Sequence, residues 1–211
     1  MTSVNKNTRK LTTTKITDEN FDVDYIENFL IDKYANNLFK KLENVEYDSD
    51  EQSSIIIYGK KYNIPRKQTS YGEPNLTYKY SNNEVSPRNW NDTEIGMKLK
   101  KIAIKLSKIT GVDYNFCLIN NYKDGSNSIG YHSDDEKELG DNPIIAGLSL
   151  GSARKIYFKS NKTKDVKILN LKHNSVFLMR GTTNKYWKHS IPKTTKPLGR
   201  RISLTFRKII M

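Results

Sequence analysis

The stretch Arg201-Ile202-Ser203-Leu204-Thr205-Phe206-Arg207 alternates strictly between polar and apolar side chains. Because successive side chains of a β-strand point to opposite faces, the three apolar residues share one face, and the two arginines and two hydroxyl residues share the other. This alternation predicts a half-buried strand. Short apolar runs separated by Gly, Asn and Asp turns continue the pattern from Tyr114 onward. They predict strands at residues 115–122, 128–133, 144–150, 154–159, 165–170, 175–180 and 201–208.

The chain before Tyr114 contains two patterns that are typical of amphipathic helices. The first consists of Ile26, Phe29, Leu30, Tyr34, Leu38 and Leu42. The second consists of Ile95, Leu99, Ile102, Leu106 and Ile109, with Asn91 and Glu94 as a capping pair before it and Gly111 at its C-terminal end. Two N-terminal helices packed on a β-rich C-terminal half predict an α+β, mainly β fold with a double-stranded β-helix, or jelly-roll, core.

The 211 residues are enough for one domain with a substantial core, and we expect that domain at residues 18–211. The jelly-roll core is expected at about residues 112–211. Residues 1–17 are rich in Thr, Lys and Asn, which predicts a flexible basic tail. Residues 55–62 form a β-rich run interrupted at Gly59, which predicts a hairpin.

The composition favours a soluble, intracellular protein with an anionic partner. Thirty-six Lys and Arg against 23 Asp and Glu give a net charge of +13, which suits nucleic acid but also fits a lysine-rich surface with no partner. The single cysteine, Cys117, excludes an intrachain disulfide and fits a reducing compartment, nucleus or cytoplasm. No apolar run is long enough to span a membrane, and the N-terminus lacks a secretion signal. No second apolar surface is evident, so we expect a monomer.

Two of the three histidines form a candidate metal site with one carboxylate. His132-Ser133-Asp134 places His132 and Asp134 on one face of an extended strand, and His189 can supply a third ligand from a distant strand. Two histidines and one carboxylate on one face of an octahedral ion are the pattern of non-heme Fe(II) oxygenases. The motif also arises by chance or for structural reasons. We assign no role to the third histidine, His173.

The polar face of the stretch at 201–207 needs an anionic partner if it is buried, because a buried guanidinium group must be paired. Protein carboxylates are one possible partner of Arg201 and Arg207. A dicarboxylate ligand is the other, since the planar guanidinium fork matches a carboxylate. A 2-oxo-dicarboxylate can chelate iron at one end and meet an arginine at the other.

Five ordered motifs together resemble the AlkB family of 2-oxoglutarate- and Fe(II)-dependent dioxygenases, from about residue 50 to the C-terminus. They are Asn120-Asn121-Tyr122, residues 132–136, residues 144–151, His189-Ser190-Ile191-Pro192 and residues 201–207. The chain is most similar to the eukaryotic-type branch that repairs alkylated DNA. Four segments between residues 50 and 90 carry that similarity: Tyr58-Gly59-Lys60, Pro65-Arg66-Lys67-Gln68, Tyr71-Gly72 and residues 77–81.

The resemblance implies a function and roles for particular residues. It implies oxidative demethylation of N1-methyladenine and N3-methylcytosine in DNA, with Fe(II), 2-oxoglutarate and O2, releasing formaldehyde, succinate and CO2. His132, Asp134 and His189 are the implied catalytic iron ligands. The implied 2-oxoglutarate-binding residues are Asn120, Tyr122, Arg201, Ser203, Thr205 and Arg207. Ser203 departs from the family pattern, in which many members have Asn at this position.

The resemblance also implies a nucleotide-recognition region at about residues 50–90. Tyr80 would stack on a flipped base opposite His132, with Tyr78 and Lys79 nearby, although Phe is commoner in the family at the Tyr80 position. Asp135 and Glu136 would face the cationic lesion. Tyr58, at the tip of the Tyr58-Gly59-Lys60 turn, would enter the base stack as a finger, or is a core residue. Candidate phosphate contacts are Arg66, Lys67, Lys185, Lys188 and Lys193.

Three alternatives stay open at this point. The substrate can be RNA or single-stranded nucleic acid instead of duplex DNA. The chain can be a non-catalytic, basic nucleic-acid-binding protein, although the full set His132, Asp134, His189 and Arg201 argues against it. A cupin-like metalloprotein of another chemistry fits the histidines but not the paired arginines.

Overall fold

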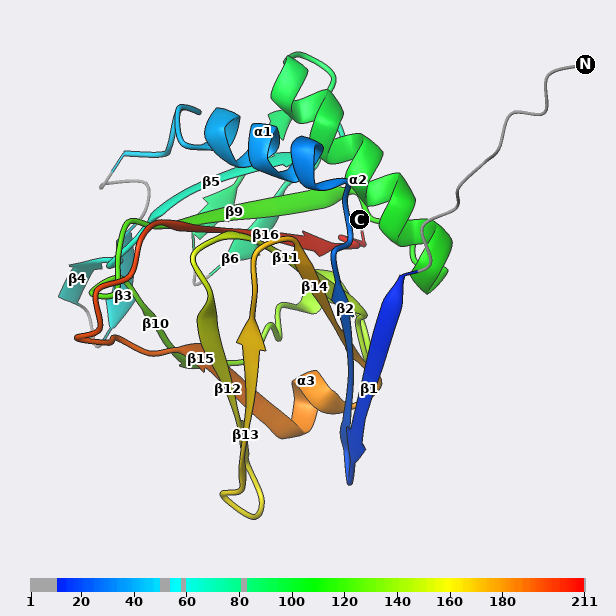
Figure 1. Cartoon of the computed structure of the whole chain (residues 1–211), viewed down its shortest axis with the longest axis vertical. Coiled ribbons are helices and arrows are strands. Elements are labelled where there is room, and N and C mark those ends of the chain that lie inside the picture. The colour runs from blue at the N-terminus through cyan, green and yellow to red at the C-terminus, as the bar shows by residue number, and fades with distance from the viewer. Residues whose placement is uncertain (1–10, 50–53, 58–59, 81–82, 211) are drawn as a thin grey trace, which may run out of the picture.

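The computed structural model describes residues 11–49, 54–57, 60–80 and 83–210, and two facing β-sheets form its centre (Figure 1). The larger sheet has eight strands in the order β1-β2-β14-β11-β16-β9-β5-β8. Their bounds are Thr12–Asp18 (β1), Phe21–Glu27 (β2), Ser175–Arg180 (β14), Ile145–Gly151 (β11), Arg201–Arg207 (β16), Phe116–Tyr122 (β9), Lys67–Gly72 (β5) and Arg88–Asn89 (β8). The smaller sheet has four strands in the order β10 (Ile129–His132), β15 (Trp187–Ile191), β12 (Arg154–Ser160) and β13 (Val166–Leu171). This two-sheet, mainly β architecture is a jelly roll.

Strand β16 lies in the middle of the larger sheet and has the two faces that its alternation predicts. It pairs antiparallel with β11 on one side and with β9 on the other. Ile202, Leu204 and Phe206 are fully buried in the cluster that also contains helix residues. Arg201 and Arg207 line a cavity between the sheets. The alternation of one strand thus separates the apolar core from a polar cavity.

Helices α1 (Asp32–Leu42) and α2 (Glu94–Thr110) lie on the outer face of the larger sheet (Figure 1). Leu38 and Leu42 of α1, and Leu99, Ile102 and Leu106 of α2, pack with sheet residues in one cluster. Helix α2 ends at Gly111, which adopts the left-handed conformation (φ 75°) as predicted. Its N-cap is Thr93, whose hydroxyl accepts from the Gly96 N–H at 3.0 Å, so the predicted capping pair was wrong. A third, short helix, α3 (Thr183–Tyr186), precedes β15.

The N-terminal segment differs from the prediction in two ways. Residues 12–17, expected in a flexible tail, belong to β1, which pairs with β2 along its whole length. Ile26, expected in the first helix, lies in β2, and the helix begins only at Asp32. The apolar spacing from Ile26 to Leu30 looked helical, but Phe21-Asp22-Val23-Asp24-Tyr25 alternates with the period of a strand. Phe21, Val23 and Tyr25 are buried between the two sheets.

Two small hairpins lie outside the main sheets. Strands β3 (Ser54–Ile57) and β4 (Lys60–Asn63) pair antiparallel, which confirms the predicted hairpin. Strands β6 (Tyr78–Tyr80) and β7 (Asn83–Val85) form the second hairpin. Among the described residues, no helix has the length and apolarity needed to cross a membrane.

Asn174, in the turn between β13 and β14, fixes the entry into α1. Its Oδ1 accepts from the Leu30 N–H at 2.8 Å, and its Nδ2 donates to the Leu30 carbonyl at 2.8 Å. Helix α1 has no side-chain cap at Ile31, and the contacts of Asn174 to Leu30 fix the chain just before the helix begins. Asn174 is buried and has a φ of 59°, a conformation that Asn tolerates better than Ala.

We expect Asn174→Ala to lower the free energy of unfolding by about 2 to 4 kcal/mol, because Leu30 loses two buried hydrogen bonds. Urea denaturation measures the change. The control is Asn44→Ala, which removes one exposed hydrogen bond to the Lys40 carbonyl and should change stability by less than about 0.5 kcal/mol. Equal effects of the two substitutions would contradict the role given to Asn174.

Candidate metal and co-substrate site

One cavity between the two sheets contains all nine residues that the sequence assigned to the metal and to 2-oxoglutarate. The larger sheet contributes residues from its central strands β9 and β16, and the smaller sheet contributes the histidines. The nine residues are Asn120, Tyr122, His132, Asp134, His189, Arg201, Ser203, Thr205 and Arg207. Apolar side chains such as Ile145, Ile156 and Met179 form the rest of the wall.

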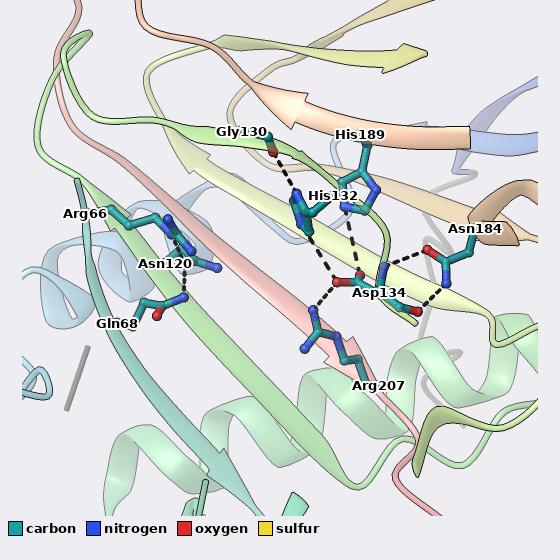
Figure 2. Close-up of polar contacts among 9 residues, drawn as sticks. All are labelled: Arg66, Gln68, Asn120, Gly130, His132, Asp134, Asn184, His189 and Arg207. Carbon is teal, nitrogen blue, oxygen red and sulfur yellow. Dashed lines mark hydrogen bonds and ion pairs between the residues drawn. The ribbon is translucent and has the colours of Figure 1, made fainter. Parts of the chain in front are cut away.

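His132, Asp134 and His189 converge on one point (Figure 2). One potential ligand atom from each lies within 4.8 Å of the other two. His132 and His189 are directly opposite each other in the β10–β15 pair, and their Nε2 atoms lie 3.9 and 4.0 Å from the Asp134 carboxylate oxygens. Asp134 lies in the loop after β10, not on the strand as predicted, and it still faces both rings. The three groups are spaced as ligands of a single ion.

Arg207 holds the Asp134 carboxylate in its charged form. Its Nη2 donates to Asp134 Oδ1 at 2.6 Å, and both side chains are almost fully buried. Burial alone would raise the pKa of Asp134, but the charge and hydrogen bond of Arg207 hold the pKa below its ordinary value. A buried carboxylate that stays ionised is a suitable ligand for a divalent cation.

The two histidines are kept neutral. Burial lowers the pKa of His189 to about 3, and it also lowers the pKa of His132. His132 Nδ1 lies 2.9 Å from the Gly130 carbonyl oxygen, so this nitrogen carries the proton and donates it. The Nε2 lone pair of His132 is therefore directed toward Asp134 and free to bind metal.

Asn184, on α3, clamps the main chain of Asp134 (Figure 2). Its Oδ1 accepts from the Asp134 N–H at 3.0 Å, and its Nδ2 donates to the Asp134 carbonyl. Asn184 is buried, and α3 is itself tied to β2 by two hydrogen bonds between Thr183 and the main chain of Asp22. The loop that contains Asp134 is thus held in place by α3, whose Asn184 lies 50 residues later in the sequence than Asp134.

Arg201 is a buried cation that forms no ion pair within the described part of the chain. Its Nε and Nη2 donate to Ser149 Oγ at 3.2 and 2.7 Å, and Nη2 also reaches Ser203 Oγ at 3.3 Å. Its Nη1 is buried and has no hydrogen-bond partner among these residues. Burial lowers the pKa of Arg201 to about 10, which the Tyr122 ring beside it partly opposes, so the group stays charged near neutrality. An uncompensated guanidinium facing a cavity calls for an anionic ligand.

Arg66 does not lie where a phosphate contact was expected. It is buried, and its Nε donates to Asn120 Oδ1 at 2.8 Å (Figure 2). Gln68 Nε2 donates to the same oxygen at 2.7 Å. The chain turns Arg66 inward because it enters β5 beside β9, where Asn120 is directly opposite Gln68. Arg66 therefore contacts Asn120 in the wall of the cavity, and it also lines the surface depression that contains Lys67.

The other substrate-side predictions have different outcomes. Asp135, Glu136, Lys185 and Lys188 line a separate basin beside Asp134. Burial raises the pKa of Glu136, and the charge of Asp134 adds to this shift. The charge of Arg207 lowers the pKa but does not cancel the shift. Lys67 and Lys193 line two further surface depressions. Two of the residues, Tyr58 and Gly59, are outside the described residues; Lys60 lies in β4, and Tyr78, Lys79 and Tyr80 form β6.

Three residues that hold the site together had no role assigned from the sequence: Ser149, Asn184 and Gln68. Ser149 stands opposite Ser203 in the β11–β16 pair, which a strand register would have given. Asn184 lies on α3, a short helix between β14 and β15 that the sequence did not predict. His173, expected to have no role, accepts a hydrogen bond at Nδ1 from the Gly151 N–H at 2.9 Å.

Comparisons with known proteins agree with this geometry. The model of the 2OG-Fe(II) oxygenase superfamily matches residues 22–207. The DNA oxidative demethylase ALKBH2 of Homo sapiens is 38% identical over 186 residues, which cover 84% of this chain and 69% of that protein. The chain belongs to the AlkB family of 2OG-Fe(II) oxygenases.

Other relatives extend the comparison. ALKBH2 of Bos taurus is 38% identical over 83% of this chain and 65% of its own length. The alpha-ketoglutarate-dependent dioxygenase alkB homolog 3 of Homo sapiens is 33% identical over 70% of this chain and 53% of its own length. The solved structure of OsALKBH1 covers 93% of this chain with a TM-score of 0.62 at 13% identity, which supports the fold. The chain thus spans about half to two thirds of the length of several of these relatives.

The residues present fit the metal and co-substrate of the family, which are Fe(II) and 2-oxoglutarate with O2. Two neutral histidines and one ionised carboxylate are the donor set for Fe(II) in such oxygenases. The unpaired Nη1 of Arg201, in the same cavity, suits one carboxylate of a dicarboxylate.

We expect Asn184→Ala to weaken metal binding by roughly 10-fold to 100-fold, because residues that orient a ligand contribute that much to affinity. Isothermal titration calorimetry with Mn(II) measures it. The matched control is Asn161→Ala, which removes a hydrogen bond to the Lys185 carbonyl but no contact to Asp134. Metal affinity that is the same in both variants would show that Asn184 does not position Asp134.

Proposed function

We propose that this protein removes alkyl groups from nucleic-acid bases by oxidation, as a direct-reversal DNA repair enzyme. The preferred substrates are N1-methyladenine and N3-methylcytosine in DNA. The observation that carries the proposal is the single cavity that joins the His132–Asp134–His189 group to an uncompensated Arg201. The similarity to proteins named DNA oxidative demethylase supports the choice of substrate.

In this proposal the histidines and Asp134 bind the metal, and the arginines bind the carboxylates of the co-substrate. His132, Asp134 and His189 hold Fe(II), which with 2-oxoglutarate and O2 supplies the chemistry that hydroxylates an N-methyl group. Arg201 pairs with the distal carboxylate of 2-oxoglutarate, supported by the hydroxyls of Ser203 and Thr205. Arg207 forms an ion pair with Asp134. In this proposal it would also support the carboxylate of 2-oxoglutarate at the metal end. The products are formaldehyde, succinate, CO2 and the repaired base.

The substrate side of the proposal rests on charge and on the hairpins. A net charge of +13 favours a phosphate-bearing partner. Hairpins β3–β4 and β6–β7 belong to the proposed nucleotide-recognition region at about residues 50–90, with Tyr78, Lys79 and Tyr80 as the base-stacking strand and Tyr58-Gly59-Lys60 as the finger. Asp135 and Glu136 are proposed to face the positive charge of the lesion. The protein is proposed to act as a monomer in the nucleus or cytoplasm.

The test is mass spectrometry of oligonucleotides that carry N1-methyladenine or N3-methylcytosine, single-stranded and annealed, after incubation with Fe(II), 2-oxoglutarate and ascorbate. Methyl loss from DNA that disappears in His132→Ala is the expected result. Matched methylated RNA oligonucleotides run beside the DNA. Loss from RNA alone would replace DNA as the substrate, and loss from neither would contradict the proposed activity.

We expect Arg201→Lys to raise the KM for 2-oxoglutarate by roughly 10-fold to 100-fold, because a single ammonium group cannot form the two parallel hydrogen bonds of a guanidinium. Steady-state kinetics at varied 2-oxoglutarate measures the change. Arg200→Lys is the control, since Arg200 lies next in sequence but contacts Glu43 and Asn121 outside the cavity. A KM that is unchanged in Arg201→Lys would remove Arg201 from the co-substrate site.

A further inference from the structure

The side chains of Arg66, Gln68 and Asn120 meet at Asn120 Oδ1 (Figure 2), and Asn120 lines the cavity. Arg66 Nε and Gln68 Nε2 lie 2.8 and 2.7 Å from this oxygen, and all three residues are buried. An arginine Nε can only donate a hydrogen bond, so the Asn120 atom that it contacts must be the oxygen. The contact with Arg66 thus fixes the orientation of the Asn120 amide, and Gln68 must therefore present its own NH2 group to the same oxygen.

The orientation of the Asn120 amide decides which of its groups is available to a ligand in the cavity. With Oδ1 held by two donors, the Asn120 amide has only its NH2 group left to offer. 2-Oxoglutarate carries two carboxylates and a ketone, all of which accept hydrogen bonds and none of which donates. The reversed amide would present an oxygen to an anion, which is repulsive. Only the orientation that Arg66 and Gln68 impose allows Asn120 to bind this co-substrate.

Asn120 is one member of a row of polar side chains across the larger sheet. Strand register places Gln68, Asn120, Ser203 and Ser149 on consecutive strands β5, β9, β16 and β11. Ser149 and Ser203 at one end of this row hold Arg201. Arg66 and Gln68 at the other end hold Asn120. The row therefore fixes two cavity residues at once, from opposite sides.

We propose that Arg66 and Gln68 are positioning residues for 2-oxoglutarate, which they orient through the Asn120 amide. The inference rests on the proposed function only in taking 2-oxoglutarate as the co-substrate. It replaces the phosphate contact that the sequence suggested for Arg66. It also connects the co-substrate pocket to the segment that follows hairpin β3–β4, since Arg66 is three residues beyond Asn63.

The test measures the affinity of the Mn(II)-loaded protein for 2-oxoglutarate by isothermal titration calorimetry, and the affinity for a methylated oligonucleotide by fluorescence anisotropy. Arg66→Met keeps an unbranched apolar stem and removes the guanidinium donors. We expect it to weaken 2-oxoglutarate binding by roughly 10-fold, the effect of losing a hydrogen bond to a charged group, with kcat at saturating 2-oxoglutarate much less affected. Oligonucleotide affinity should stay within about 2-fold of wild type.

Two further variants separate positioning from charge and from folding. Gln68→Leu removes an uncharged donor to the same oxygen, so its expected loss of roughly 3-fold to 10-fold in 2-oxoglutarate affinity cannot come from lost positive charge. Lys123→Met, an exposed lysine at the end of β9, removes a charge nearby without touching Asn120 and should leave 2-oxoglutarate affinity unchanged. Thermal unfolding of each variant verifies that it is folded.

Results that contradict the positioning role of Arg66 and Gln68 differ from results that contradict the proposed function. Unchanged 2-oxoglutarate affinity in folded Arg66→Met and Gln68→Leu would overturn the inference. Weakened oligonucleotide binding without a change for 2-oxoglutarate would show that Arg66 contacts phosphate after all. A wild-type protein that binds 2-oxoglutarate but demethylates no nucleic acid would contradict the proposed function and leave the positioning test intact.

Discussion

The ion pair between Arg207 and Asp134 is the contact on which the site depends. It joins β16, in the middle of the larger sheet, to the loop that follows β10 of the smaller sheet. The two side chains are 2.6 Å apart and almost fully buried. Burying two charges is costly unless each is paired and hydrogen-bonded, so neither residue is stable in this place without the other. The pair keeps Asp134 ionised beside two neutral histidines, and the metal site follows from that combination.

The need to pair buried charges also explains how polar groups can lie inside the jelly roll. Apolar side chains line part of the inter-sheet cavity, while β9 and β16 of the larger sheet contribute arginines, hydroxyls and one amide, and His132, Asp134 and His189 complete the polar part. Arg207 is neutralised by a protein carboxylate and Arg201 is not, so the two ends of the strand have different tasks. One end belongs to the metal, and the other is available to a ligand carboxylate.

Much of this site could be predicted from the sequence because strand alternation and short motifs are local. The alternation of residues 201–207 predicted both faces of β16. Type and spacing made the histidines with Asp134 a candidate metal site, and the resemblance to the AlkB family implied their role as iron ligands. The inward turn of Arg66 could not be predicted, since it depends on which strand lies next to β9. The strand β1 was missed because Thr and Lys carry no apolar pattern, and its stability comes from pairing with β2. Asn184 and Asn174 act on main-chain atoms distant in sequence, which composition does not reveal.

We propose that Arg201 and the metal ligands hold the two ends of one dicarboxylate. A crystal structure of the protein with Mn(II) and 2-oxoglutarate tests it most directly. We predict one ion bound by His132, Asp134 and His189, with the far carboxylate of 2-oxoglutarate on Arg201 and an oxygen of the same molecule near the Asn120 NH2 group. An ion bound elsewhere, or 2-oxoglutarate in the basin beside Asp135 with Arg201 unliganded, would contradict it.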